Sequence, residues 1–216
     1  MGHYPISHDP DPIRLFKSDF LEFFTHISPV AVTIIWLPFA GYMLISEILA
    51  GLARQDSLWY VLAAFLIGLF LWTFAEYNLH RFVFHFPPKT PAQERITYLF
   101  HGIHHHQPQC KTRLVMPPVV SIPLSALFYG LFTLIVGVLL GLSQWVHPLV
   151  AGFTIGYLVY DLTHYATHHF PMRSGIGRYL KRYHLKHHYK TPDQRYGVSS
   201  PLWDVVYGTM PKEAEA

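Results

Sequence analysis

Ten histidines stand in four groups whose spacing is typical of metal ligands. The groups are His80/His85, His101/His104/His105, His164/His168 and His184/His187/His188. Residues three or four apart lie on one face of an α-helix, about 5–6 Å apart at Cβ, so most of these groups can present two or three imidazoles to one side. A loose metal-sequestering tract would instead be clustered and of low complexity. Ten imidazoles exceed what one ion holds, so the pattern predicts a site for two metal ions.

The pair His80/His85 departs from helical spacing. Its members are five residues apart, so a break or bulge after His80 is expected. Two acids stand near ligand candidates: Glu76 is four residues before His80, and Asp161 is three before His164. Either carboxylate could accept the second ring N–H of a histidine ligand and fix its tautomer. The alternative for both acids is an ordinary charge at a helix end.

The identity of the metal does not follow from the ligand type, because imidazole binds iron, zinc, copper and nickel. The choice among these metals depends on the reaction that the site performs. Zinc has no redox states, whereas iron can activate dioxygen. We expect two ions: iron if the working protein activates dioxygen, with zinc able to occupy the site in an isolated protein.

Apolar segments of membrane-spanning length must position these groups. Only 13% of the 216 residues are charged, against about 25% in soluble proteins. Apolar stretches occur at about 30–50, 57–78, 119–142 and 145–162, each near the ~20 residues that cross a bilayer as a helix. Short links within each half require antiparallel hairpins. We predict an all-α integral membrane protein with four transmembrane helices in two hairpins and a helical cap that holds the dimetal site.

The distribution of basic residues predicts the orientation. Fifteen Lys and Arg residues lie on the side of the histidine groups, and only Arg54 lies on the other side. The positive-inside rule therefore places both termini, the cap and the metal site in the cytoplasm. Residues 1–28 are expected to form a cytoplasmic or interfacial segment, and residues 29–216 the membrane domain.

The order HRxxxH, HxxHH, HxxxH, HxxHH resembles the fatty acid hydroxylase/sterol desaturase superfamily of membrane-bound dimetal oxygenases. Some stretches are similar to its fatty acid 2-hydroxylase branch: 80–86, 113–118, 156–165, 184–189 and 196–204. The resemblance covers about 70–210. It implies that the ten histidines hold the metals and that O2 is used to hydroxylate a long acyl chain next to its carboxyl carbon. A free fatty acid, an acyl thioester and a ceramide or sphingolipid acyl chain remain open as substrates.

The resemblance also implies the partners: a lipid bilayer, a lipid acyl substrate, O2 and an electron source. Many eukaryotic relatives carry an N-terminal haem domain, whereas 28 polar residues precede the first apolar span here. A separate donor of haem, ferredoxin or flavoprotein type is therefore expected, and a bacterial inner membrane is favoured over the endoplasmic reticulum. Candidates for contact with the lipid head group are Arg113, Tyr165, Tyr196 and Trp203, with interface anchoring or packing as their alternative role. No nucleic-acid-reading motif is recognisable.

Three other functions are considered. A sterol or carotenoid hydroxylase or desaturase of the same superfamily is the first. A metal transporter would place its ligands near the membrane midplane, whereas these histidines lie outside the apolar stretches. A dizinc hydrolase would commonly bridge its ions with carboxylates, and none lies inside the four motifs. The pattern thus favours the oxygenase over the transporter and the hydrolase.

Overall fold

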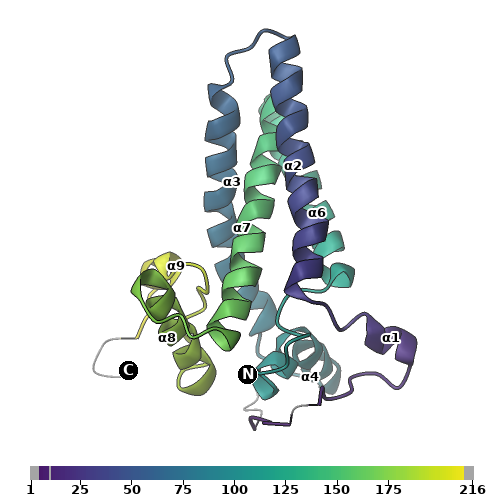
Figure 1. The fold of residues 1–216 in the computed structure, drawn as a ribbon, viewed down its shortest axis with the longest axis vertical. Helices are drawn as coiled ribbons and strands as arrows, with labels where there is room; N and C mark the ends of the chain where they lie inside the picture. The colour runs from purple at the N-terminus through teal and green to yellow at the C-terminus, as the bar shows by residue number, and fades with distance from the viewer. Residues whose placement is uncertain (1–4, 10, 212–216) are drawn as a thin grey trace. The chain divides into compact units, whose positions relative to one another are not determined.

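The computed structural model describes residues 5–9 and 11–211, and all the regular secondary structure in this part of the chain is helical (Figure 1). The elements in order are α1 (Asp19–Phe23), α2 (Pro29–Ala53), α3 (Trp59–Asn78), η1 (Leu79–Phe84), α4 (Pro91–Thr97), η2 (Tyr98–Gly102), α5 (Ile103–His106), α6 (Pro118–Phe132), η3 (Thr133–Leu139), α7 (Ser143–His169), α8 (Gly175–Tyr189) and α9 (Leu202–Val206). The three η elements are π-helices. The expected all-α class is confirmed. Residues 1–4 and 10 of the predicted N-terminal segment, and 212–216 of the predicted membrane domain, lie outside the described residues.

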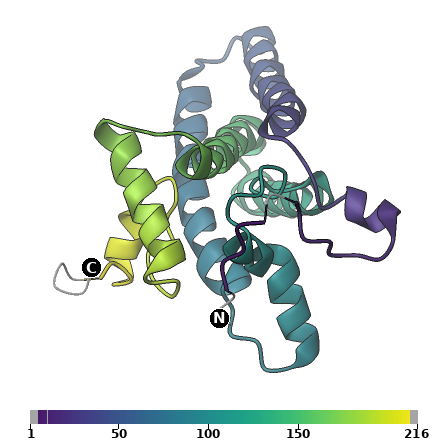
Figure 2. The ribbon, with the colours of Figure 1, turned by 60° about the horizontal axis from the view of Figure 1, so that its bottom comes forward.

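Two compact units make up the chain, and each combines distant parts of the sequence. The bundle unit comprises residues 29–72 and 116–159. The histidine unit comprises the described residues of 1–28, 73–115 and 160–216, and it contains all ten spaced histidines. Within the histidine unit, α8 and α9 lie side by side in both ribbon views (Figure 2).

Three helical stretches are long and apolar enough to cross a membrane: Pro29–Ala53, Trp59–Phe84 and Pro118–Leu139. They correspond to the first three predicted spans. The second is longer than predicted because the π-helix η1 continues α3 without interruption. A helix also forms where the fourth span was predicted, but α7 is not among the candidate spans. The fourth crossing is therefore not confirmed.

Helix α7 is less apolar because much of its surface packs against other helices of the bundle unit. Its backbone approaches that of α3 closely: a Cβ added at Gly152 would lie 1.9 Å from the Phe65 carbonyl oxygen, and one at Gly68 would lie 2.1 Å from that of Leu149. Small residues permit such contacts between membrane helices. The ring of His147 on α7 lies with Nδ1 3.2 Å from the Ser46 hydroxyl of α2, so this polar group is satisfied inside the bundle.

We predict that Gly152→Ala destabilises the protein, because its methyl group would overlap the Phe65 carbonyl and push α3 from α7. The expected loss is about 1–3 kcal/mol, as for overpacked cores, seen as a lower thermal unfolding midpoint in detergent. Gly130→Ala on α6 is the matched control, since a Cβ there meets nothing within 4 Å and alanine favours helix. Equal midpoints for the two variants would contradict the close packing of α3 and α7.

Candidate metal centre

The ten spaced histidines converge into two groups of five in the histidine unit. The first group is His80, His85, His101, His105 and His187, and the second is His104, His164, His168, His184 and His188. In each group, one ring nitrogen per residue lies within 4.8 Å of those of the other four. Nearly all of these side chains are buried. Either group could therefore hold a metal ion.

The two halves of the chain exchange one histidine each. The first group takes four members from residues 80–105 and its fifth, His187, from α8. The second group takes four members from residues 164–188 and its fifth, His104, from α5. In each HxxHH motif the first and last histidines join the local group, and the middle one crosses to the other group. The sequence predicted convergence of these motifs but not this division.

The irregular spacing of His80 and His85 is accommodated by a π-helix. In η1, the backbone N–H of His85 donates to the His80 carbonyl at 3.1 Å. A π-turn joins residues i and i+5 in this way, so two side chains five residues apart come to the same side. Their ring centroids are 4.8 Å apart. The predicted bulge after His80 is confirmed.

The ring nitrogens approach one another as the ligands of a common ion would. His101 Nε2 lies 3.0 Å from His80 Nε2 and 3.1 Å from His105 Nε2. Six such nitrogen–nitrogen distances fall between 2.9 and 3.1 Å. A neutral imidazole carries one proton, so the rings cannot satisfy all these contacts as hydrogen bonds. Two ligands at about 90° on an ion, with bonds of about 2.1 Å, stand about 3 Å apart.

Some buried ring nitrogens have no hydrogen-bond partner within the described part of the chain. They include His187 Nε2 and both nitrogens of His85. Leaving a polar atom buried and unpaired costs about 1–3 kcal/mol, and a metal ion would satisfy these lone pairs. The donor set, its spacing and its unpaired atoms thus all fit a metal centre.

Burial keeps these imidazoles neutral, which is the form that binds metal. Desolvation, followed by repulsion from neighbouring rings, lowers the pKa of His105 to about 3. Desolvation likewise lowers the pKa of His164 to about 4. The rings are therefore neutral at neutral pH, which is the form that can bind metal.

Backbone carbonyls fix the outer nitrogens of two rings. His80 Nδ1 donates to the Tyr196 carbonyl at 2.5 Å, and His187 Nδ1 donates to the Gln194 carbonyl at 2.7 Å. A bond of this kind fixes the tautomer, so Nε2 faces the other rings. The predicted contact between Glu76 and the His80 ring is absent from the described residues, because the Tyr196 carbonyl takes that place.

Glu76 instead holds the segment that carries this carbonyl. Its carboxylate accepts the N–H groups of Val198 and Ser199 at 2.6 and 2.8 Å, and also the Ser199 hydroxyl. Asp204, fully buried, accepts the N–H groups of Tyr196 and Gly197 at 2.8 and 2.7 Å. Both carboxylates therefore act on the rings through residues 196–199.

The sequence analysis singled out residues 196–204 by resemblance but did not predict their supporting role, because a main-chain carbonyl has no signature in residue type. The available signals were Gly197 and the buried acid Asp204. A Cβ at Gly197 would lie 2.0 Å from the Ser200 carbonyl oxygen, so the tight turn requires glycine. Asp161, the other predicted supporting acid, is 1% exposed and lies one turn before His164; its role remains a prediction.

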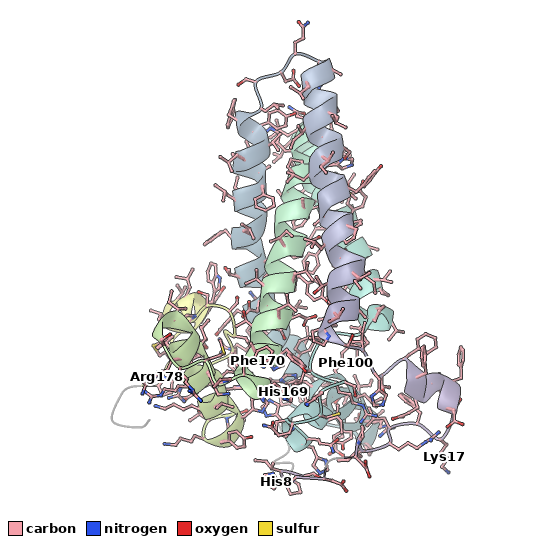
Figure 3. All side chains as sticks on the ribbon, viewed as in Figure 1. His8, Lys17, Phe100, His169, Phe170 and Arg178 are labelled. Carbon is pink, nitrogen blue, oxygen red and sulfur yellow. The ribbon has the colours of Figure 1, made fainter. Side chains whose placement is uncertain are left out.

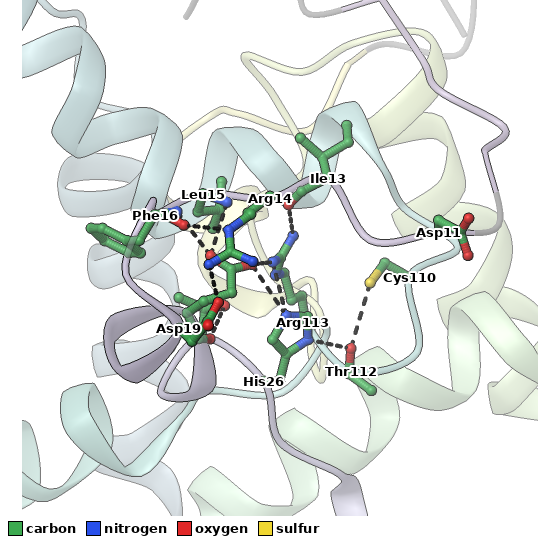
Figure 4. Close-up of polar contacts among 12 residues, drawn as sticks. Asp11, Ile13, Arg14, Leu15, Phe16, Asp19, His26, Cys110, Thr112 and Arg113 are labelled. Atoms are coloured by element: carbon green, nitrogen blue, oxygen red, sulfur yellow. Dashed lines mark hydrogen bonds and ion pairs between the residues drawn. The ribbon is translucent and has the colours of Figure 1, made fainter.

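Arg113 is engaged by the N-terminal segment rather than open to a lipid head group (Figure 4). Its guanidinium donates to the Ile13 carbonyl and pairs with Glu22. One of its nitrogens also lies 2.9 Å from His26 Nε2. The side chain is 9% exposed, so the structure does not favour its predicted contact with substrate.

The other three head-group candidates lie in different surroundings. Tyr196 is buried, and its ring centroid lies 5.4–5.9 Å from those of His80, His85 and His187. Tyr165 packs on His169, and Trp203 donates its indole N–H to the Thr73 hydroxyl at 2.9 Å. Of these three side chains, Tyr196 is the one whose ring lies against the first group of five histidines.

Comparison with known proteins gives consistent matches. The family model described as fatty acid hydroxylase matches residues 65–209. A dihydroceramide fatty acyl 2-hydroxylase of Arabidopsis thaliana is 38% identical over 97% of this chain and 84% of its own length. A fatty acid 2-hydroxylase of Mus musculus is 35% identical over 98% and 60%. A ceramide very long chain fatty acid hydroxylase of Saccharomyces cerevisiae is 38% identical over 96% and 52%.

A solved structure of full-length scs7p, in which only the hydroxylase domain is visible, has a similar fold. The TM-score is 0.79 at 38% identity, covering 90% of this chain and 70% of that one. The relatives named above come from a plant, a mammal and a yeast. They give no support to the expected bacterial inner membrane.

We predict that the metal-free protein loses stability as the pH falls below about 6.5. The unfolded chain binds protons on histidine near pH 6.5, whereas His105 and His164 in the folded chain bind them only near pH 3 and 4. Between these values the unfolded state holds more protons, so the free energy of unfolding falls with the pH. Thermal unfolding midpoints of chelator-treated protein at pH 7.5 and 5 would measure this effect. His164→Asn should reduce the slope, and a midpoint independent of pH would refute the prediction.

Proposed function

Because the chain belongs to the fatty acid hydroxylase family, we propose that it is an O2-dependent monooxygenase that hydroxylates a long acyl chain at the carbon next to the carboxyl carbon. The observation that carries this proposal is the pair of five-imidazole groups, which lie wholly within the residues that match the family. The relatives are named for 2-hydroxylation of fatty acids or for hydroxylation of ceramide acyl chains.

The names of the relatives favour an acyl chain carried on a ceramide-type lipid as the substrate. Two are described as acting on dihydroceramide or ceramide, and the third as a fatty acid 2-hydroxylase. The sterol or carotenoid alternative gains no support from these comparisons. We therefore take a dihydroceramide or ceramide acyl chain as the first substrate to test.

We infer that each imidazole group holds one iron ion, with all ten histidines as ligands: His80, His85, His101, His105 and His187 for one, and His104, His164, His168, His184 and His188 for the other. Iron, when bound, supplies the activation of dioxygen. The overall reaction balances as RH + O2 + 2 electrons + 2 protons giving ROH + H2O.

The residues of the chain hold the rings in place, keep them neutral and exclude water. Burial of the rings excludes solvent and keeps their nitrogens unprotonated. The carbonyls of Tyr196 and Gln194 orient two of them. The Tyr196 ring closes one side of the first group, so it is the head-group candidate that we retain as a substrate contact.

The chain is a membrane protein with three helices suited to crossing a bilayer, and we propose α7 as the fourth crossing. Four crossings would place residues 1–28, 79–118 and 163–216 on one side. The 15 Lys and Arg residues on that side, against Arg54 alone on the other, favour the cytoplasm for them. The electrons would then arrive from a cytoplasmic carrier.

We predict that the purified protein, loaded with ferrous iron and given a reductant, converts a dihydroceramide to its 2-hydroxyacyl form. Mass spectrometry after reaction under isotopically labelled O2 should show one labelled oxygen in the product. The same assay without O2 is the control and should give no product. Hydroxylation at another carbon, a new double bond or a hydroxylated sterol would each contradict the proposed reaction.

His104→Ala and His187→Ala should each lower bound metal from about two ions per chain to about one, with loss of turnover. Each removes the one ligand that a group receives from the other half of the chain. Metal analysis by mass spectrometry and the hydroxylation assay measure the two effects. His8→Ala, at an exposed histidine, is the matched control and should keep both. Full metal content and turnover in the first two variants would refute the ligand assignment.

A further inference from the structure

Helix α8 separates the imidazole groups from solvent on one side of the histidine unit. Its inner face supplies His187 to the first group, and His184 and His188 to the second. Leu180 and Tyr183 are buried on the same face. A helix with side chains is about 10 Å across, so a molecule bound to the outer face of α8 would lie about one helix diameter from rings of both groups.

The outer face of α8 is strongly basic. The helix contains four Lys or Arg residues and no acid, and Arg173 and Lys190 flank it. Lys181 is already engaged, since its ammonium donates to the Thr167 and Phe170 carbonyls at 2.7 and 2.8 Å. Arg178 and Arg182, by contrast, are exposed. Being four residues apart, they share one side of the helix.

These exposed arginines have no ion-pair partner within the described residues. Figure 3 labels Arg178 on the outer side of α8. Neighbouring Tyr179 and Tyr189 are each 47% exposed. Arg and Tyr together are enriched where proteins bind other proteins, and the uncompensated charge would attract an acidic surface.

We propose that the outer face of α8, centred on Arg178 and Arg182, docks an acidic one-electron carrier protein. This inference rests on the proposed function, because each hydroxylation consumes two electrons and the carrier would deliver them one at a time. The carrier is oxidised, and its electrons enter the reaction with two protons to release one water per hydroxyl formed. The α8 histidines connect this helix covalently to both groups.

A membrane surface is the other partner that a basic helix could contact. A helix that lies in the interface buries its apolar face among lipids. The apolar face of α8 is already buried within the protein against the imidazole groups. The exposed side chains of the helix are Ile176, Arg178, Tyr179, Arg182 and Tyr189. Only one of them is aliphatic, and this composition favours a protein partner.

The test is binding of soluble cytochrome b5 and of a plant-type ferredoxin, both acidic carriers, to the full chain in phosphatidylcholine nanodiscs. Surface plasmon resonance should show binding that weakens with salt. The double variant Arg178→Glu/Arg182→Glu should raise the dissociation constant of the carrier that binds by about tenfold or more. Lys17→Glu/Lys89→Glu, at two exposed lysines elsewhere in the histidine unit, is the matched control and should bind like the unsubstituted protein.

The docking surface is refuted if neither carrier binds the unsubstituted protein. It is also refuted if the α8 variant binds the carrier as tightly as the unsubstituted protein does. If phosphatidylserine stabilises the unsubstituted protein more than the variant while carrier binding is unchanged, the face contacts lipid and the proposal is wrong. Turnover after anaerobic reduction with dithionite and addition of O2 should be the same in both proteins. Absence of product in the unsubstituted protein would refute the proposed hydroxylation, whereas the binding comparison would still decide the docking surface.

Discussion

The structure depends on holding ten neutral imidazoles together out of water. Their ring nitrogens approach to 2.9–3.1 Å, where lone pairs face one another and no arrangement of single protons satisfies every ring. Desolvation makes protonation unfavourable, so the rings cannot resolve the conflict by charging at neutral pH. Bound metal would turn this cost into a stabilising interaction, and metal binding is therefore expected to be coupled to folding.

The coupling between metal binding and folding would act through the one histidine that each half of the site gives to the other. If the groups bind metal, His187 attaches α8 to the first ion and His104 attaches α5 to the second. Neither half of the histidine unit would complete its own coordination sphere. Each half of the sequence contains a predicted hairpin followed by histidine motifs, and the two halves thus become parts of one site. Its assembly requires residues more than 80 positions apart.

The sequence was sufficient for features that follow from spacing and composition. Side chains at helical intervals predicted which histidines converge, and the interval of five between His80 and His85 predicted a local bulge that is now seen as a π-helix. Apolar runs predicted three of the membrane-spanning helices. The fourth predicted span forms the helix α7, which is not among the candidate spans, because residues buried between helices, such as Gly152 and His147, are selected for packing rather than for contact with lipid.

The support around the rings could not be predicted in the same way, because it uses main-chain atoms and long-range contacts. Glu76 was predicted to contact the His80 ring because of its position in the sequence. It acts on that ring indirectly, by fixing the turn that presents the Tyr196 carbonyl. Arg113 was expected at the substrate, yet it binds the N-terminal segment through Glu22. A further anchor of that segment is the buried Gln107, whose amide bonds the backbone at Asp9, Asp11 and Ile13. Gln107 follows His105 by two residues, so the N-terminal segment restrains the helices η2 and α5, which supply three of the ten rings.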